Sequence, residues 1–375
     1  MVEVPELNAP QPSKPTRVTP RVAVVYTSPE TVLADYAKAM DLAQISTHLS
    51  KSVPTLLKIN ISWQHYYPAC STTPWQLDGV IGKLRQDGYS DLIPAQNGTV
   101  VVNSFEGEIK NKQKPVIEKH ELSSVHLDVP PTLWIPYQPK AKMLVLDKIY
   151  PDGILIPEIF MGKNVVHLPT MKTHVFTTMT GAMKNAFGGL LNRKRHWTHS
   201  VIHETLVDLL SIQKEIHPGI FAVMDGTFAG DGPGPRAMRW HEKNVILASA
   251  DQVAIDAVAA GMMGFDPLAI KFIRLAHELQ LGCGDLSNIE VVGDDVSRVN
   301  WHFTGQQNTF ASRGQKLIYW GPLRPVEHLL LRTPLVRLAY LASNIYHNVY
   351  WRNTIGRIRI ARAMKTGWGK LFKSY

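Results

Sequence analysis

The sequence predicts an α/β protein of two lobes, each with a mostly parallel sheet covered by helices, followed by a basic helical C-terminal extension. Short apolar runs typical of buried strands alternate with segments of helical periodicity, most clearly over residues 143–293. The 375 residues are enough to bury the cores of two such units. Residues 321–375 differ in composition from the rest of the chain, which sets the extension apart.

The first lobe is expected over residues 21–150, after a polar, Pro-rich segment, residues 1–20, that we expect to be disordered. Thr73, Pro74 and Gln76 form a capping-box sequence at the start of a helix. The expected elements are strands at 21–26, 53–59, 91–95 and 99–102, a helix within 30–50, a helix from 74 to about 86, and an irregular connection over 106–142.

The second lobe is expected over residues 151–300, where alternating strands and helices favour parallel pairing. Asp251 and Asp256 lie among small apolar residues of one expected helix, and we interpret them as structural hydrogen-bonding partners. A strand at 143–146 is expected just before this lobe. The elements expected within it are strands at 165–168, 220–224, 245–248 and 289–292, and helices at 199–216, from 249, and from 266 to about 282.

The stretch 164–197 is the strongest candidate for a ligand site. A short apolar strand ends at Pro169, and the expected loop after it carries cations, amides and glycines, which suit an anionic ligand. A solvated basic loop is the alternative, but the charges are interleaved with glycines and apolar residues. The candidate residues are Lys172, His174, Lys184, Asn185, Gly188 and Arg193.

Four further ligand-binding residues are predicted at one crevice. Lys58 and Asn60 lie at the carboxyl end of an expected strand, and Thr72 and Thr73 lie at an expected helix N-terminus. In open α/β sheets both places border the crevice where ligands bind. The alternative is that Thr73 only caps its helix and that Lys58 only extends its charge to solvent. Asp225 follows another strand and is either a catalytic carboxylate or a turn residue.

His196, His199 and His203 are candidate metal ligands, because the last two share a helix face at i, i+4. The acidic residue inside H-E-x-x-H zinc motifs is missing here, and fifteen histidines make chance pairs common. His174 is the better candidate for proton transfer, because Lys184 follows it by ten residues.

The formal net charge of +9 lies entirely in residues 321–375, which hold ten Lys or Arg and one acidic residue, Glu327. The rest of the chain is balanced, so its composition excludes a polyanion-binding body, and no nucleic-acid motif accompanies the tail. A basic amphipathic segment with Trp at apolar positions suits an anionic membrane surface. Packing on the body, or contact with a second copy in a homo-oligomer, fits the pattern equally well.

Cys70 and Cys283 are too few to ligate an iron–sulfur cluster or to form a disulfide framework. The N-terminal residues have no apolar leader, and no stretch reaches the about 18 apolar residues that span a bilayer. We therefore expect a cytoplasmic protein, in peripheral contact with a membrane if the tail binds one.

Six motifs lie between about residues 20 and 295. They are KIN (58–60), STTP (71–74), LPTMKTHVFTTMTGAMKNAFGGL (168–190), MDGTFAGDGPGP (224–235), ILASADQVAIDAVAAGMMG (246–264) and GCGDLSNIEVVGDD (282–295). Together they resemble the DUF362 family, a domain of unknown function. Many members of that family carry a ferredoxin-like iron–sulfur module, for which this chain lacks the cysteines.

The spacing His174-x9-Lys184, with Gly181 between, is similar to that of the nickel-pincer lactate racemase family. This resemblance implies that Lys184 holds or contacts a metal-containing or nucleotide-type cofactor and that His174 is a ligand or an acid–base group. We expect an isomerase- or oxidoreductase-like enzyme acting on, or through, an anionic small molecule, with Asp225 closing the crevice. The alternative is a membrane-surface binding or scaffold protein that acts through residues 321–375.

Overall fold

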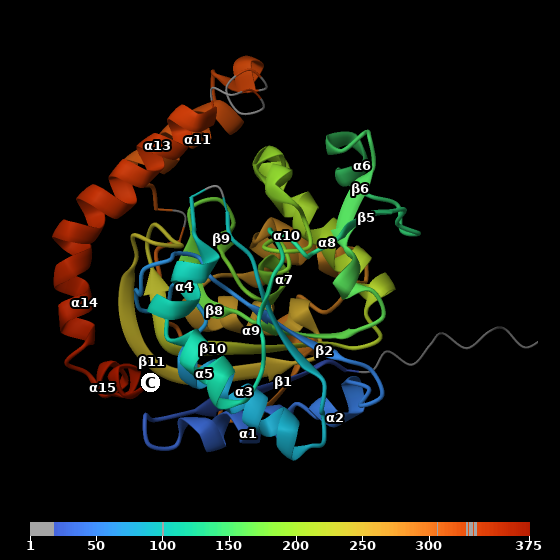
Figure 1. Cartoon of the computed structure of the whole chain (residues 1–375), viewed down its shortest axis with the longest axis vertical. Coiled ribbons are helices and arrows are strands. Elements are labelled where there is room, and N and C mark those ends of the chain that lie inside the picture. The colour runs from blue at the N-terminus through green and yellow to red at the C-terminus, as the bar shows by residue number, and fades with distance from the viewer. Residues whose placement is uncertain (1–18, 100, 306, 328, 330–332, 334–335) are drawn as a thin grey trace, which may run out of the picture.

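One mixed sheet of ten strands forms the centre of the protein (Figure 1). The computed structural model describes residues 19–99, 101–305, 307–327, 329, 333 and 336–375, so residues 1–18 of the predicted disordered segment lie outside it. The strands of the sheet are β1 (Arg21–Tyr26), β2 (Thr55–Ile59), β3 (Leu92–Gln96), β4 (Val125–His126), β7 (Asn164–Leu168), β8 (Thr170–His174), β9 (Thr178–Met179), β10 (Ile220–Asp231), β11 (Arg239–Ser249) and β12 (Glu290–Gly293).

The strand order confirms the predicted α/β class. The main path runs β12-β1-β11-β10-β7-β2-β3-β4, with β8 pairing to β10 and β9 to β8. Six of the described pairings in this sheet are parallel and three are antiparallel. A separate antiparallel pair joins β5 (Trp134–Tyr137) and β6 (Ile154–Pro157).

Helices cover both faces of the sheet (Figure 1). The helices described here are α1 (Val32–Leu42), α2 (Ile45–His48), α3 (Pro74–Gln86), α4 (Ser104–Lys110), α5 (Gln113–Lys119), α6 (Leu146–Ile149), α7 (Ala182–Asn185), η2 (Arg193–Val201), α8 (Ile202–Ile216), α9 (Gln252–Met263), α10 (Lys271–Glu278), α11 (Phe310–Tyr319), α13 (Val336–Asn344), the π-helix η6 (Ile345–Gly356), α14 (Arg357–Ala363) and α15 (Gly367–Ser374). Alternate residues of β1 enter two cores, because successive side chains of a strand point to opposite faces. Val22 and Val24 pack with α8 and α9, whereas Ala23 and Val25 pack with α1 and α3.

The two predicted lobes share this single sheet. β7 pairs in parallel with β2 from the first segment and with β10 from the second, and β1 pairs antiparallel with β11. Both hydrophobic cores contain residues from 21–150 and from 151–300. The expectation of one sheet per lobe is therefore corrected. Hydrophobic periodicity identifies strands, but it carries no information about which strands pair.

Several elements also differ from the sequence expectation. The helix expected within 30–50 is interrupted at Gln44, whose φ of 57° is left-handed, so α1 ends and α2 begins there. The segment 106–142, expected to be irregular, contains most of α4 together with α5, β4 and β5. The strand expected at 143–146 does not form, because its last three N–H groups donate to the carboxylate of Asp208.

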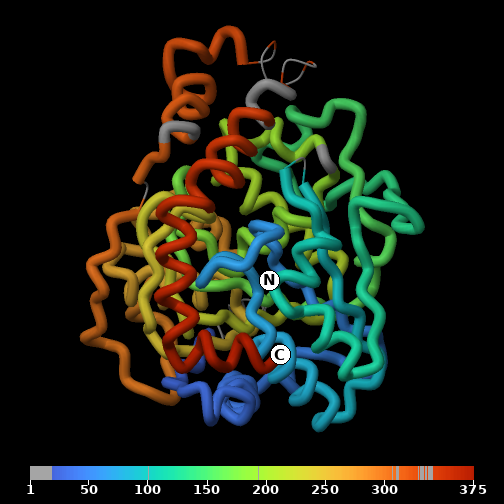
Figure 2. Tube along the Cα trace, turned by 60° about the vertical axis from the view of Figure 1, so that its left-hand side comes forward, coloured from blue at the N-terminus to red at the C-terminus, as the bar shows by residue number. Residues whose placement is uncertain are grey.

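The C-terminal helices run along one side of the molecule (Figures 1 and 2). We call residues 336–363, which comprise α13, η6 and α14, the C-terminal arm. The helix after the arm, α15, packs on the body: buried Trp368 lies against Trp75 with ring centroids 5.2 Å apart, and its Nε1 donates to Asn244 Oδ1 at 2.7 Å. The inner side of the arm packs there too: buried Trp351 of η6 lies 5.1 Å from Tyr67 between ring centroids, and Trp240 Nε1 donates to Arg359 O of α14 at 3.0 Å. Packing on the body, one of the alternatives left open for the tail, therefore holds for α15 and for one side of the arm.

Candidate anion-binding site

A cavity of about 650 Å³ lies at the carboxyl ends of the parallel strands β2, β3, β4 and β7. Residues that end or follow these strands line it, among them Lys58, Asn97, Asp128 and Pro169. Residues of α11, α13 and η6 line it as well. Ligands of open α/β sheets bind at this edge, because loops and helix starts converge there.

Lys58 and Lys172 are the most deeply buried cations of the cavity, each with 2% of its surface exposed. Lys58 Nζ donates to Ile59 O at 2.6 Å, and Lys172 Nζ donates to Cys70 O at 2.5 Å. Burial lowers the pKa of Lys58 to about 7 and that of Lys172 to about 8. Their described hydrogen bonds go to carbonyl and hydroxyl oxygens, none of which neutralises their charge. Lys172 lies on strand β8, where the sequence analysis expected a loop.

Lys184 and Asn185 are held at the cavity by the short helix α7. Both oxygens of the Asp256 carboxylate accept hydrogen bonds from the first two N–H groups of α7, at 2.6 and 3.1 Å. Gly181 precedes this helix with a φ of +111°, and a Cβ there would lie 2.2 Å from Asp256 Oδ1. Asp256 is thus structural, as the sequence analysis interpreted it, and it positions the lysine that follows.

Lys184 is a half-buried cation available to a ligand. Within the described ranges no hydrogen bond or ion pair involves its Nζ, which lies 5.2 Å from the ring centroid of Phe187. Burial, together with the nearby charges of Lys172 and Arg195, lowers its pKa to about 7. An ammonium group without a polar partner is costly to bury, so an anion placed beside it would stabilise it.

Two arginines that the sequence analysis did not assign to the site also line the cavity. Arg195 Nη2 donates to Gly98 O at 3.3 Å, and Arg236 Nε donates to Ser62 O at 3.0 Å. Burial lowers the pKa of Arg195 to about 10. Two features of the sequence could have identified them. Arg236 directly follows a Gly- and Pro-rich loop, and Arg195 belongs to the run of three cations at 193–195. The side chain of Arg193, which was predicted, lies outside the described part of the structure.

The charge of the cavity lining is strongly unbalanced. Among the described lining residues Asp128 is the only acidic one, and its oxygen already accepts from Gly98 N at 2.6 Å. The lining Lys and Arg residues are Lys58, Lys172, Lys184, Lys194, Arg195 and Arg236.

His174, at the end of β8, lines the same cavity and is buried. Its Nδ1 accepts a hydrogen bond from Phe176 N at 3.2 Å. Burial and the charge of Lys184 hold its pKa well below the usual range, so the imidazole is neutral near pH 7. With Nδ1 accepting, Nε2 carries the proton. The structure thus brings His174 and Lys184, ten residues apart, to one cavity.

Glycines and amides complete this part of the lining. Gly188 and Gly189 follow α7, and a Cβ on Gly189, whose φ is +129°, would lie 2.8 Å from Lys58 Cε. Asn185 Nδ2 donates to Lys58 O at 2.8 Å. Asn60 Nδ2 donates to a neighbouring carbonyl at 3.2 Å. The glycines therefore allow close approach of the loop to the lysine, and the amides hold the strand end.

Thr72, Thr73 and Asp225 do not lie in this lining, although the sequence analysis placed them at the crevice. Buried Asp225 accepts hydrogen bonds from Tyr36 Oη and Thr73 Oγ1, both at 2.7 Å, and from Trp75 Nε1 at 3.0 Å. Thr73 also forms the predicted capping box of α3, and Thr72 Oγ1 donates to the last carbonyl of β7. Asp225 therefore ties α1 and α3 to the sheet instead of closing the crevice, because β10 continues past it.

The predicted metal site at His196, His199 and His203 is not assembled. His199 Nδ1 donates to His196 O at 3.0 Å, and its ring stacks on Tyr319 with centroids 5.8 Å apart. His203 stacks on Phe272 instead and does not line the cavity. Over the residues that the structure describes, no group of three His, Cys, Asp or Glu side chains is arranged to hold a metal ion. Helical spacing placed two histidines on one face, but aromatic packing directs their rings to different neighbours.

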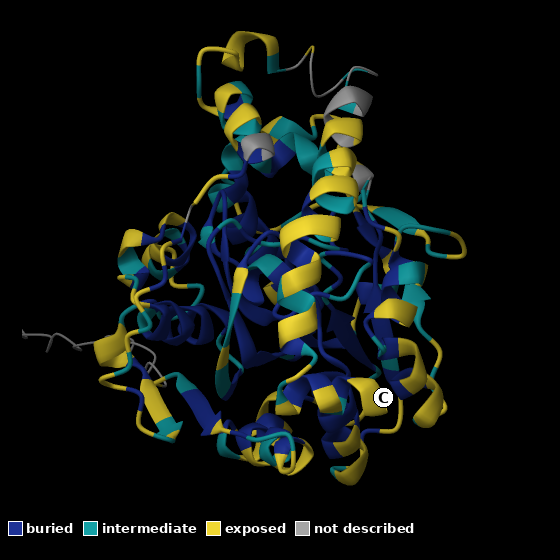
Figure 3. Ribbon diagram, turned by 90° about the vertical axis from the view of Figure 1, so that its left-hand side faces the viewer, coloured by how far each residue is buried: buried dark blue, intermediate teal, exposed yellow. Residues whose placement is uncertain are grey.

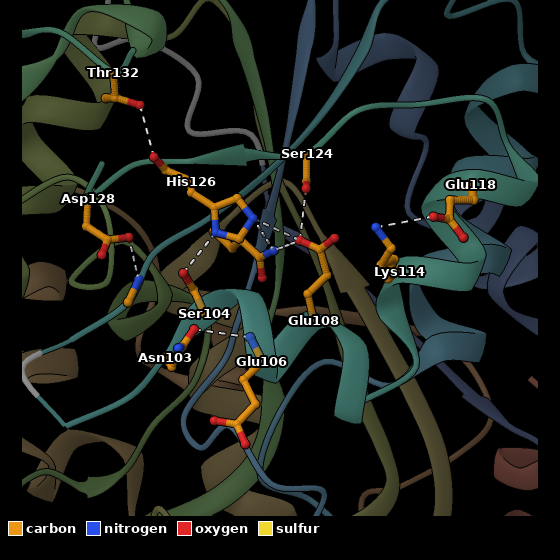
Figure 4. A network of polar contacts seen from close by, with 12 residues as sticks. Asn103, Ser104, Glu106, Glu108, Lys114, Glu118, Ser124, His126, Asp128 and Thr132 are labelled. Atoms are coloured by element: carbon orange, nitrogen blue, oxygen red, sulfur yellow. Dashed lines mark hydrogen bonds and ion pairs between the residues drawn. The ribbon is translucent and has the colours of Figure 1, made fainter. Parts of the chain in front are cut away.

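A second polar network, beside the cavity, links Ser104, His126 and Glu108 (Figure 4). Ser104 Oγ lies 2.8 Å from His126 Nδ1, and His126 Nε2 lies 3.2 Å from Glu108 Oε2. Although these three residue types occur in hydrolase triads, Ser104 is 2% exposed and does not line the cavity. The network instead holds α4 against β4, the strand that leads to Asp128.

The family model described as Domain of unknown function (DUF362) matches residues 55–261. This chain belongs to the DUF362 family. The matched region runs from β2 into α9 and contains His174 and the six Lys and Arg residues of the described cavity lining, whereas the C-terminal arm lies outside it. The resemblance noted from the sequence motifs is thereby confirmed.

A thylakoid-associated protein of Synechocystis sp. is 31% identical to this DUF362 chain over 124 residues, which are 31% of this chain and 37% of that protein. The chain thus spans little more than a third of that relative's length. No solved structure matches the chain significantly. None of the helices in the described ranges combines the length and the apolar character that crossing a membrane requires.

Proposed function

We propose that this DUF362 protein binds a small anionic molecule in the cavity and acts on it as an enzyme. The observation that supports this most is the excess of Lys and Arg over acidic residues in the described lining. Buried like charges repel one another and lose hydration, so a ligand with two or more negative charges would offset both costs. Phosphate and carboxylate groups have this chemistry.

Each lining residue has a distinct proposed role. Lys58 and Lys172 hold negative charge at the floor, close to the strand ends. Lys184, with a pKa of about 7, acts through its charge when protonated or as a nucleophile when neutral. His174, neutral with its proton on Nε2, transfers a proton to or from the bound molecule.

Isothermal titration calorimetry with sulfate, diphosphate and citrate tests the proposal. At least one of these anions should bind the wild-type protein, and Lys184→Met should weaken that binding roughly tenfold or more, as expected for loss of a charged hydrogen bond. Circular dichroism should show the same folded state for both proteins. Lys142→Met is the matched control, because Lys142 is exposed and does not line the cavity. Equal affinity of wild type and Lys184→Met, or no binding by any of the three anions, would contradict the proposal.

Lys184 and His174 could also bind a cofactor, as the resemblance to the lactate racemase family implies. Lys184 Nζ has no polar partner in the described ranges, and His174 lines the same cavity. Native mass spectrometry beside the denatured intact mass tests this. Extra mass that survives denaturation in wild type and disappears in Lys184→Met would establish a covalent group. Equal masses of both proteins, after allowing for the substitution, would reject it.

As a second function we propose that the C-terminal arm binds an anionic membrane surface. Leu341, Ile345, Val349 and Ile358 of the arm are 51–60% exposed, and Figure 3 shows its outer face largely exposed. Residues 328–375 contain no Asp or Glu, so basic groups accompany these apolar side chains. A thylakoid-associated relative is compatible with such a location.

Sedimentation with vesicles of phosphatidylglycerol and phosphatidylcholine at low salt tests this second function. The full-length protein should sediment, and the triple substitution Ile345→Ser, Val349→Ser, Ile358→Ser should reduce the bound fraction several-fold. Leu133→Ser is the control, because Leu133 is 64% exposed and lies outside the arm. Equal binding by the triple variant, or no binding by the wild type, would exclude the arm as a membrane-binding surface.

A further inference from the structure

The helices that line the cavity on one side expose apolar side chains on the other. Tyr319 of α11 and His347 of η6 line the cavity. Leu341 of α13 and Ile345 of η6 are 57% and 51% exposed. One thin layer of helix therefore separates the cationic cavity from an apolar outer surface.

The cavity has more room and more apolar surface than a small anion needs. Its volume of about 650 Å³ is in the range that takes a drug-sized molecule. The described lining residues from α11, α13 and η6 include no Lys, Arg, Asp or Glu, so the fixed charges lie on the sheet side. Aliphatic and aromatic residues fill much of the remaining lining, including Ile61, Val101, Leu127, Trp134, Phe176 and Leu191.

We propose that the ligand is an amphiphile with an anionic phosphate head group and a hydrocarbon tail, taken up from the bilayer that the arm contacts. This inference rests on both proposed functions, anion binding in the cavity and contact of the arm with a membrane. The head group lies among Lys58, Lys172 and Lys184, where its charge is matched. The tail lies along the apolar lining, where each buried methylene adds to affinity. Because helices of the arm also line the cavity, the exposed apolar surface of the arm places the cavity next to the source of the lipid.

Calorimetry with three monomeric probes separates head group from tail. The probes are butyl phosphate, dodecyl phosphate and the uncharged dodecyl maltoside, each below its micelle concentration. Dodecyl phosphate should bind with one-to-one stoichiometry and at least on the order of a hundredfold more tightly than butyl phosphate, which corresponds to burial of about half of its additional methylenes. Lys184→Met should weaken the binding of both phosphates. Val101→Trp, which narrows the apolar part of the cavity, should weaken the binding of dodecyl phosphate alone.

The possible results distinguish binding of an amphiphile from the anion binding on which it depends. Equal affinity for butyl and dodecyl phosphate would overturn the amphiphile while leaving an anion site. Dodecyl maltoside binding as tightly as dodecyl phosphate would overturn it as well, because the head group would not be recognised. Failure of both phosphates to bind, in a protein that binds sulfate or diphosphate, would also reject it, whereas failure of every anion would remove the anion site itself.

Transfer from vesicles identifies the source of the ligand. Dodecyl phosphate carried in phosphatidylcholine vesicles should reach the wild-type protein faster than it reaches the triple serine variant of the arm. The two proteins should bind the free probe with equal affinity, because the substituted residues do not line the cavity. Equal transfer rates would contradict uptake from a bilayer and favour a ligand taken from solution.

Discussion

The cavity and the C-terminal arm are both basic, yet the cavity buries two of its lysines while the arm exposes several apolar residues between cations. In the cavity, Lys58 and Lys172 are almost fully buried, and burial lowers the pKa of both side chains. On the arm, Arg357 and Arg362 are exposed beside Ile358. Positive charge therefore favours different partners in the two regions. A buried lysine binds a ligand that excludes water, whereas exposed arginines attract a charged surface.

The largest expected effect concerns how the arm is held to the body. Trp368→Ala should lower the free energy of unfolding by about 3–5 kcal/mol, because it removes a buried ring and its hydrogen bond to Asn244. Leu341→Ala on the exposed face should change it by no more than about 0.5 kcal/mol. Urea denaturation measures both values. Similar values for the two variants would mean that the packing of Trp368 on the body contributes little to the stability of the fold.

Two pairs of substitutions, one in the cavity and one on the arm, test whether the two basic regions act separately. The double substitution Lys58→Met, Lys184→Met should weaken anion binding on the order of a hundredfold and leave vesicle sedimentation unchanged. Arg357→Gln, Arg362→Gln should do the reverse, reducing sedimentation several-fold at low salt. Calorimetry and sedimentation of the same preparations provide both readouts. Loss of both activities in either variant would contradict independent action.

The smallest expected effect is the pH dependence of anion binding, in which the cavity should differ clearly from the arm. Sulfate keeps its charge between pH 6 and 9, whereas Lys58 and Lys184 lose protons near pH 7 and Lys172 near pH 8. Because the protonated lysines attract the anion, sulfate affinity should fall roughly tenfold as the pH rises across this range. Vesicle binding through arginines should stay nearly constant. Flat sulfate affinity would show that these lysines do not bind it.

Local features of the molecule could be predicted from the sequence because their causes lie close together along the chain. The apolar run of β1 and the capping box at Thr73 formed as expected. The helix ending at Ile216 did so as well, although it starts three residues later than expected. The strand expected before Asp147 did not form, because a carboxylate 62 to 64 residues away bonds its N–H groups. Sequence periodicity has no access to such a distant partner.

The residues of the candidate site likewise include some that the sequence predicted correctly and some that it did not. Lys58, Lys172, His174 and Lys184 were singled out because they lie near strand ends and in one unusual stretch, and the structure brings them to one cavity. Asp225 met the same criteria but points to a buried network with Tyr36 and Trp75. Which side of the sheet a strand-end side chain faces depends on pairing and register, which a single chain segment does not specify.

By itself the sequence determined the α/β class, the family and the concentration of net positive charge in residues 321–375. These follow from composition, short-range periodicity and motifs. Only the tertiary structure decided that one sheet joins both halves of the chain, that Arg195 and Arg236 share a cavity with four lysines, and that the arm exposes apolar side chains. The physical reason is that strand pairing and helix docking bring together residues far apart in the chain, and the burial and charge environment of each group exist only after they meet.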